Sequence, residues 1–177
     1  MNRSLTPQWL PGSLLLLILL VASSPGCRFY SLTGASIPDR FTTIAIPTFE
    51  DRSRSGQPTL GEDFTDLLID RFVRQTRLRL AQDEFEADIV LRGYIEGYTS
   101  QPVAVSGQEQ ATQNRVTLSV YVEYRDQIED EELLVQSFRN AENYDPAVDG
   151  LDGETAAAFA ALKNITEDIF TAATSDW

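Results

Sequence analysis

The chain of 177 residues contains no histidine, one cysteine and one lysine. Without histidine it lacks the commonest metal ligand in proteins and the usual general base near neutral pH. With a single cysteine, Cys27, it can form neither an internal disulfide nor a Cys-His catalytic pair. Ser-His-Asp catalysis and the common Cys/His zinc sites are excluded as well, so we expect neither an enzyme nor a metal or other dissociable cofactor.

Basic residues are also scarce, with 14 lysines and arginines against 27 acidic residues and a net charge of −13. So acidic a surface argues against nucleic acid as a partner. The acidic runs at residues 83–86 and 129–132 are typical of solvated turns. The arginines at residues 52–54 and 71–79 are of the type that holds a phosphate, but pairing with the many surface acids explains them more simply.

Only one long hydrophobic run occurs, at residues 14–22, and its nine residues fall far short of the roughly 20 that span a bilayer. Arg3 precedes the run and small residues follow it, which is the pattern of a secretory signal peptide over residues 1–26. Gly26-Cys27 resembles the end of a bacterial lipobox, in which the cysteine is acylated and becomes the mature N-terminus.

We therefore expect a covalent lipid on Cys27, which anchors the chain stably if more than one acyl chain is attached. Arg28 stands where an Asp would favour the inner membrane, so we expect the periplasmic side of the outer membrane. An ordinary secreted protein with a thiol near its cleavage point is the simpler alternative, although an unpaired exported cysteine is unusual.

Hydrophobic periodicity predicts four strands and two helices in residues 41–177, after a lipidated tether at residues 27–40. Thr59 and Glu62 have the spacing of a capping box at the start of the first helix. The strands are expected at residues 41–47, 88–98, 115–124 and 133–139, the helices at 60–77 and 154–174, and loops at 100–113 and 140–153.

The order β-α-β-β-β-α predicts a single α+β domain, a two-layer sandwich with both helices on one face of a four-stranded, mainly antiparallel sheet. The opposite sheet face, with Tyr94, Tyr98, Tyr121 and Arg115, is expected to be solvated or covered by a partner. The apolar faces of the helices are expected to consist of Leu60, Phe64, Leu67, Leu68 and Phe72 in the first, and of Phe159, Leu162, Ile165, Ile169 and Ala173 in the second.

Several short segments, in order along nearly the whole mature chain, resemble the LptE lipoproteins, most closely the form found in the Bacteroidetes and their relatives. Each segment is short, and their common order makes the resemblance specific. They are Tyr30-Ser31-Leu32-Thr33-Gly34 after Cys27, Thr43-Ile44-x-Ile46-Pro47-x-Phe49, Asp70-Arg71-Phe72-x-x-Gln75-Thr76-Arg77-Leu78 and Asn114-Arg115-Val116-Thr117-Leu118.

This resemblance implies an outer-membrane lipoprotein of the lipopolysaccharide transport machinery. Such a protein forms a one-to-one complex with the LptD-type β-barrel, plugs its lumen, helps it assemble and contacts lipopolysaccharide. We further expect the loop at residues 101–114 to insert into the barrel. Arg77, Arg115, Gln108 and Gln110 are the candidate contacts to lipopolysaccharide or the partner.

Two alternatives stay open at this point. Ile44-Ala45-Ile46-Pro47-x-Phe49-Glu50 is similar to the opening strand of curli-type secretion lipoproteins, which form rings with a self-complementary interface. A hydrolase of cell-wall sugars would instead need two carboxylates roughly 5–10 Å apart in a cleft.

Overall fold

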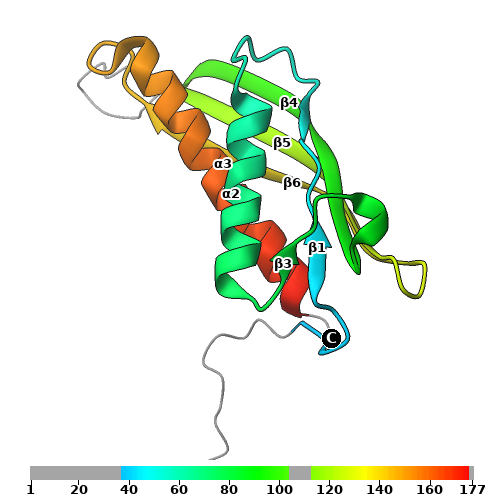
Figure 1. Ribbon diagram of the computed structural model, residues 1–177. Helices are drawn as coiled ribbons and strands as arrows, with labels where there is room; N and C mark the ends of the chain where they lie inside the picture. Colours follow the sequence, from blue (N-terminus) through cyan, green and yellow to red (C-terminus); the bar gives the residue numbers. More distant parts are fainter. Residues whose placement is uncertain (1–36, 104–112, 176–177) are drawn as a thin grey trace, which may run out of the picture. The chain divides into compact units, whose positions relative to one another are not determined.

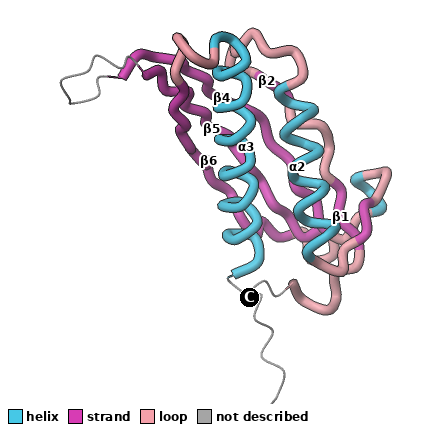
Figure 2. The backbone as a smooth tube through the Cα atoms, turned by 90° about the vertical axis from the view of Figure 1, so that its left-hand side faces the viewer, coloured by secondary structure: helices cyan, strands magenta, loops and turns pink. Residues whose placement is uncertain are grey.

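The computed structural model describes residues 37–103 and 113–175. The expected signal peptide, the lipidation site Cys27, most of the tether and Trp177 lie outside the described residues. The described part is one α+β domain in which two long helices cover one face of a sheet (Figure 1). The expected class, two layers with both helices on the same side, is confirmed (Figure 2).

The sheet is mixed and has more strands than expected. In order along the chain, the elements are β1 (Thr43–Ala45), β2 (Glu50–Asp51), α2 (Leu60–Gln75), β3 (Arg79–Leu80), the 3₁₀ turn η1 (Glu84–Glu86), β4 (Ile89–Val103), β5 (Gln113–Asp126), β6 (Glu131–Tyr144) and α3 (Gly150–Ser175). The strand order is β3-β1-β4-β5-β6, and β2 pairs with β4 beside β1.

The expectation of a four-stranded, mainly antiparallel sheet was therefore wrong on two counts. The strands β2 and β3 have two residues each, too few for an alternating pattern to show in the sequence. Both β1 and β2 run parallel to β4. The chain between β2 and β4 contains α2, and a connection of this length can cross over the sheet to a parallel strand. Only β4, β5 and β6 form the antiparallel meander that the periodicity predicted.

The two long hairpin strands extend well into the expected loops. Residues 100–103 continue β4, and residues 140–144 continue β6. Their polar side chains lie on half-solvated sheet, so their composition alone resembles that of a loop. A bulge between Ile95 and Gly97 also reverses the alternation in β4. Tyr98 consequently packs against the core on the helix side, whereas it was expected on the open face.

The core lies between the helices and the sheet. Phe64 and Phe72 of α2 are fully buried, as are Leu162, Ile165 and Ile169 of α3. The stripe predicted for α3 was wrong at Phe159, which is 46% exposed. Ala158 and Ala161 are buried in its place, and these small side chains let α3 approach the sheet closely.

A three-residue contact sets α2 onto the strand layer. The Phe49 N–H donates to Thr65 Oγ1 at 2.9 Å, and this hydroxyl donates to the Gly61 carbonyl at 2.7 Å. A Cβ on Gly61 would lie 2.2 Å from the Phe49 carbonyl oxygen, so only glycine permits this approach. The expected capping box does not form, since Thr59 Oγ1 donates to Asp63 instead.

Replacing Gly61 with alanine separates helix propensity from packing. Propensity alone predicts that G61A stabilises α2 by up to about 1 kcal/mol. The clash with the Phe49 carbonyl predicts the opposite, a loss of about 1–3 kcal/mol in the free energy of unfolding. Urea denaturation measures the sign. The exposed neighbour supplies the control, since E62A is expected to change stability by less than about 0.5 kcal/mol; a G61A protein as stable as the parent would contradict the packing argument.

Candidate functional site

The structure places the predicted contact residues apart. Arg115 lies near the start of β5, opposite Gln101 of β4, at the end of the sheet that carries residues 104–112. Arg77 follows α2 and lies beside β3 and the start of β1, at the opposite end. Gln108 and Gln110 lie outside the described residues. The two arginines therefore do not form one binding site.

Arg77 holds the segment through which the chain enters the domain. Its Nη2 donates to the Ile37 carbonyl at 2.8 Å, and its Nη1 lies 2.8 Å from an Asp39 carboxylate oxygen. Ile37 itself is buried in the core. The guanidinium thus ties the end of the tether to the end of α2, and this contact accounts for Arg77 without any ligand.

Arg40 and Asp126 form the most buried ion pair of the described domain. Arg40 Nη2 donates to Asp126 Oδ2 at 2.9 Å, and the guanidinium also lies over the Phe41 ring. The other carboxylate oxygen of Asp126 accepts from the backbone N–H groups of Ile128 and Glu129, at 2.7 and 3.1 Å. The pair therefore joins the entering chain to the β5–β6 turn.

Burial alone would raise the pKa of the Asp126 carboxyl group, because it penalises the charged form. The hydrogen bonds from Arg40 and from the two N–H groups of the turn outweigh burial, and the net result is a pKa below the ordinary value. Asp126 is consequently ionised at neutral pH, and its ionisation stabilises the fold.

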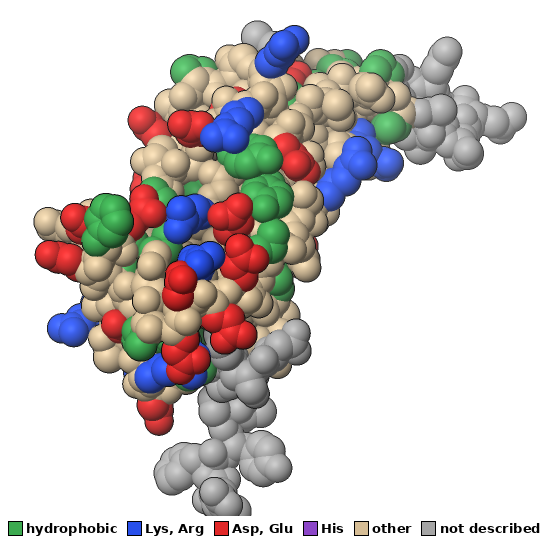
Figure 3. All heavy atoms as spheres, turned by 90° about the vertical axis from the view of Figure 1, so that its right-hand side faces the viewer, with side chains coloured by type: hydrophobic (Ala, Val, Ile, Leu, Met, Phe, Trp, Pro, Cys, Tyr) green, Lys and Arg blue, Asp and Glu red, His purple; other side chains and the backbone are tan. Residues whose placement is uncertain are grey.

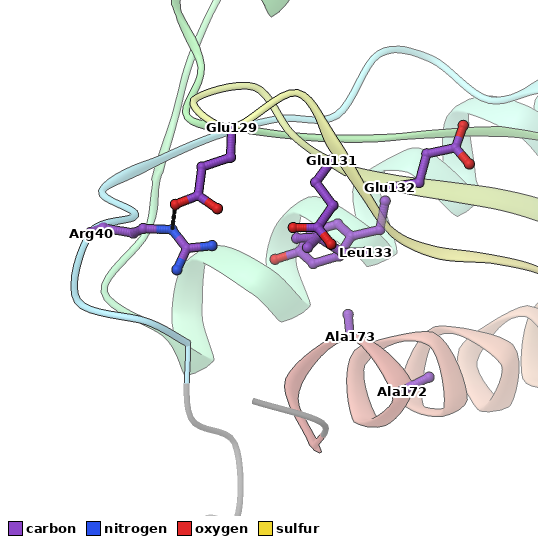
Figure 4. A pocket seen from close by; sticks show the side chains of 8 residues that line it. Arg40, Glu129, Glu131, Glu132, Leu133, Ala172 and Ala173 are labelled. Atoms are coloured by element: carbon purple, nitrogen blue, oxygen red, sulfur yellow. Dashed lines mark ion pairs between the residues drawn. The ribbon is translucent and has the colours of Figure 1, made fainter.

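Beside this pair lies a cavity of about 460 Å³ between the β5–β6 turn and the end of α3 (Figure 4). Glu129 lies 4.0 Å from Arg40 across its mouth, and Glu132 lies 3.5 Å from Arg125. The lining consists of Arg40, Tyr124, Glu129, Glu131, Glu132, Leu133, Ala172 and Ala173.

A second polar cluster lies at the other end of the domain, where residues 104–112 leave the sheet. Tyr98 and Tyr144 both donate to the Glu154 carboxylate of α3, at 2.8 and 2.9 Å. Gln57 donates to the Tyr98 hydroxyl and Asn114 to that of Tyr144. Burial and the bond to Glu154 raise the pKa of Tyr98, so the phenol stays a donor. The cluster fixes α3 to the strand ends that flank the expected insertion loop.

The face of the sheet opposite the helices is polar and aromatic, as expected for Tyr94, Tyr121 and Arg115. The Tyr94 and Tyr121 rings lie 5.2 Å apart, and Arg52 lies over Tyr94 at 4.1 Å. Arg115 donates to the neutral Asn143 side chain at 2.9 Å. Within the described residues, no ion pair involves Arg115.

Charge is divided between the two layers. The helices α2 and α3 carry three basic and eight acidic residues, a net charge of −5. The strand register places four arginines and three glutamates on the open face of β4, β5 and β6, close to neutrality. Figure 3 shows basic and acidic side chains interleaved around a strip of hydrophobic ones. The open-face residues are Arg92, Arg115, Arg125, Arg139, Glu96, Glu123 and Glu132.

Within residues 37–103 and 113–175, no group of three or more acidic or sulfur ligands could hold a metal ion. None of the described helices is both long and apolar enough to cross a membrane.

A family model described as LptE, lipopolysaccharide-assembly, matches residues 41–173. The chain belongs to the LptE family. This family consists of non-enzymatic, outer-membrane-associated lipoproteins of lipopolysaccharide assembly.

Solved structures share the LptE-like fold at low sequence identity. A minor lipoprotein from Acinetobacter baumannii is 15% identical with a TM-score of 0.50, over 77% of this chain and 93% of its own. A hypothetical protein from Chlamydia trachomatis is 11% identical with a TM-score of 0.52, over 75% of this chain and 98% of its own. No curated protein shows significant similarity to the chain.

The LptE assignment favours lipopolysaccharide assembly over the two alternatives, curli-type secretion and cell-wall hydrolysis.

The two polar clusters at the ends of the domain were not predicted from the sequence. Asp126 lies just before the acidic run at residues 129–132 and carried no signal of its own, and Tyr98 was predicted on the wrong sheet face. Only the pairing of residues 86 positions apart brings Arg40 to Asp126, and nothing local in the sequence signals it.

We expect D126N to lower the free energy of unfolding at pH 7 by about 1.5–3 kcal/mol, the range for hydrogen bonds to charged groups. Because the folded-state pKa of Asp126 is lowered, its contribution is complete above the unfolded-state pKa and is lost as pH falls through the folded value. The difference in the free energy of unfolding between D126N and the parent should therefore become smaller as the pH is lowered from 7 to 2.5. Urea denaturation at each pH measures it. D66N, at an exposed aspartate of α2 that has no hydrogen bond or ion pair among the described residues, should show no such difference. A difference between D126N and the parent that is constant with pH would contradict the argument.

Proposed function

We propose that this LptE-family chain is a lipoprotein, acylated on Cys27, that plugs an LptD-type β-barrel from the periplasmic side of the outer membrane and helps it to assemble. The observation that carries the proposal is the family match over residues 41–173, which follows a predicted signal peptide, a lipobox-like cysteine and a short tether. We further propose a one-to-one complex, in which the barrel is the partner and lipopolysaccharide the transported molecule.

The chemistry of the described surface supports the plug. The lumen of a wide outer-membrane barrel is polar and wet, so a plug needs a charged, hydrogen-bonding exterior and its own core. The domain has such a core between its helices and the sheet. Its open sheet face carries tyrosine and arginine, the residue types enriched at protein interfaces, and no lysine.

The way in which the chain enters the domain supports a plug held from the periplasmic side of the membrane. Ile37 is buried, and Arg77 and Arg40 tie the entering chain to two other parts of the domain. Nine residues separate Cys27 from the described start of the domain, a reach of at most about 30 Å. A lipid on Cys27 would therefore hold this end near the membrane, and residues 104–112 would leave the domain at the opposite end.

Direct contact with lipopolysaccharide is proposed for Arg115, together with Gln108 and Gln110 of the expected insertion loop. A phosphate needs a guanidinium that is not already neutralised, and Arg115 is exposed and bonds only a neutral amide. Arg77 fits this role less well, because Ile37 and Asp39 occupy its donors. With so acidic a chain, attraction of an anionic glycolipid has to be local.

Affinity purification of the full tagged chain from detergent-extracted envelopes tests the partnership. We expect a large outer-membrane barrel in equimolar amount, quantified by mass spectrometry. C27A should remain soluble after cell fractionation and recover less of the barrel. Isolation of the parent chain alone, or as a homo-oligomer, would overturn the plug and favour a ring-forming lipoprotein.

Measuring the binding of lipopolysaccharide to the purified full chain distinguishes the proposed contact role of Arg115 from the structural role of Arg77. R115A should weaken binding by about three- to tenfold without changing the melting temperature, since only an exposed charge is lost. R77A should lower the melting temperature and leave binding nearly unchanged. R74A, at a highly exposed helical arginine, is the control for net charge. Equal loss in R115A and R74A would argue against a local contact.

A further inference from the structure

Phe85 is the most exposed large hydrophobic residue of the described domain, with 97% of its surface accessible. It is the central residue of η1, the turn between β3 and β4. In Figure 1 this turn projects from the edge of the sheet, on the side away from the helices. An aromatic ring in this position contributes nothing to the core, so its presence calls for another explanation.

The turn that carries the ring is well fixed. The Asp83 side chain accepts from the Phe85 N–H at 2.9 Å, and the N–H groups of Glu86 and Ala87 donate to the carbonyls of Asp83 and Glu84. Just after the turn, Asp88 accepts from the N–H groups of Thr42 and Thr43, which ties it to β1. A ring presented on so rigid a turn loses little conformational entropy when it is buried by a partner.

A hollow of about 320 Å³ adjoins the ring. Its lining combines apolar residues with the acidic Asp83 and Glu84, and Leu80 of the neighbouring edge strand β3 is 45% exposed. A projecting aromatic next to an apolar hollow is the arrangement in which interface anchors pair with a partner's own anchors. The residues lining the hollow are Ala45, Ile46, Pro47, Ala81, Gln82, Asp83, Glu84 and Phe85.

We infer that Phe85 and the adjoining hollow form a docking site for a protein partner. The acidic residues Asp83, Glu84 and Glu86 lie next to Phe85 in the same turn, and no basic residue lines the hollow. Charge complementarity therefore defines the partner surface, which presents an apolar pocket for Phe85 with arginine or lysine on its rim. The same carboxylates disfavour insertion of the ring into an anionic membrane surface.

This site goes beyond the proposed plug. It lies at the sheet edge beside β1, near the described start of the domain and at the opposite end of the sheet from Arg115. The docked surface therefore belongs to a periplasmic part of an assembly, and the site does not depend on which residues meet the barrel lumen.

The experiment places a photo-crosslinking phenylalanine analogue at position 85 of the full chain in its native host, and the same analogue at position 148. Val148 is also highly exposed, at 79%, and serves as the matched control. We expect position 85 alone to give one discrete protein adduct, and mass spectrometry should map it to an apolar site flanked by basic residues. Adducts to lipid, adducts common to both positions, or none would overturn the inference.

Affinity for the crosslinked protein, purified and measured in solution, completes the test. F85A should weaken binding at least about tenfold, as for an interface hot spot, whereas V148A should leave it unchanged. The E84Q/E86Q double variant should slow association and reduce its salt dependence. All three variants should melt at the parent temperature, because these side chains are exposed. Since barrel recovery is scored separately, loss of this adduct with the barrel retained would overturn only the docking site.

Discussion

The close approach of α2 to the chain at Phe49 is the constraint on which the rest of the domain depends. Gly61 permits the approach, and the Thr65 hydroxyl fixes it by bonding both backbones. The Phe49 ring then fills the space that Gly93 leaves on β4 and meets Phe64 edge-on at 5.1 Å. The single cysteine allows no internal disulfide that could compensate. The position of α2, and of the α3 packed on it through Phe72 and Phe170, follows from this contact.

Placing both helices on one face has an electrostatic consequence. The acids concentrate on the helical layer, whereas the arginines of the long strands face the other way. An anionic ligand approaching this chain therefore meets repulsion from one side and a near-neutral surface with local guanidinium groups from the other. The strongly negative net charge and a role beside an anionic glycolipid are compatible because the charges are not evenly spread.

The sequence predicted those features that repeat along the chain and missed those made by distant residues. Apolar residues alternate along residues 115–124 and recur every three to four positions in residues 60–77. These repeats match the buried positions, so β5 and α2 were placed correctly. The bulge at Ile95/Gly97 was not visible in the alternation, and it moved Tyr98 across the sheet. Arg40–Asp126 and Tyr98–Glu154 join residues far apart in sequence, and no local pattern encodes such pairs.

The arginines illustrate how the structure sharpens a general expectation. Pairing with surface acids was the simpler explanation for those at residues 52–54 and 71–79. Arg52, Arg71, Arg74 and Arg77 are paired, whereas Arg54 and Arg79 form no ion pair with the described residues. Such pairs contribute under about 1 kcal/mol each when exposed, and they reduce the charge offered to a ligand. Within the described residues, Arg54, Arg79, Arg115 and Arg139 take part in no ion pair, and Arg115 lies at the opposite end of the sheet from Arg77. A guanidinium without a carboxylate partner keeps its full charge for an anionic group, so the pairing within the domain narrows the candidates for such a contact.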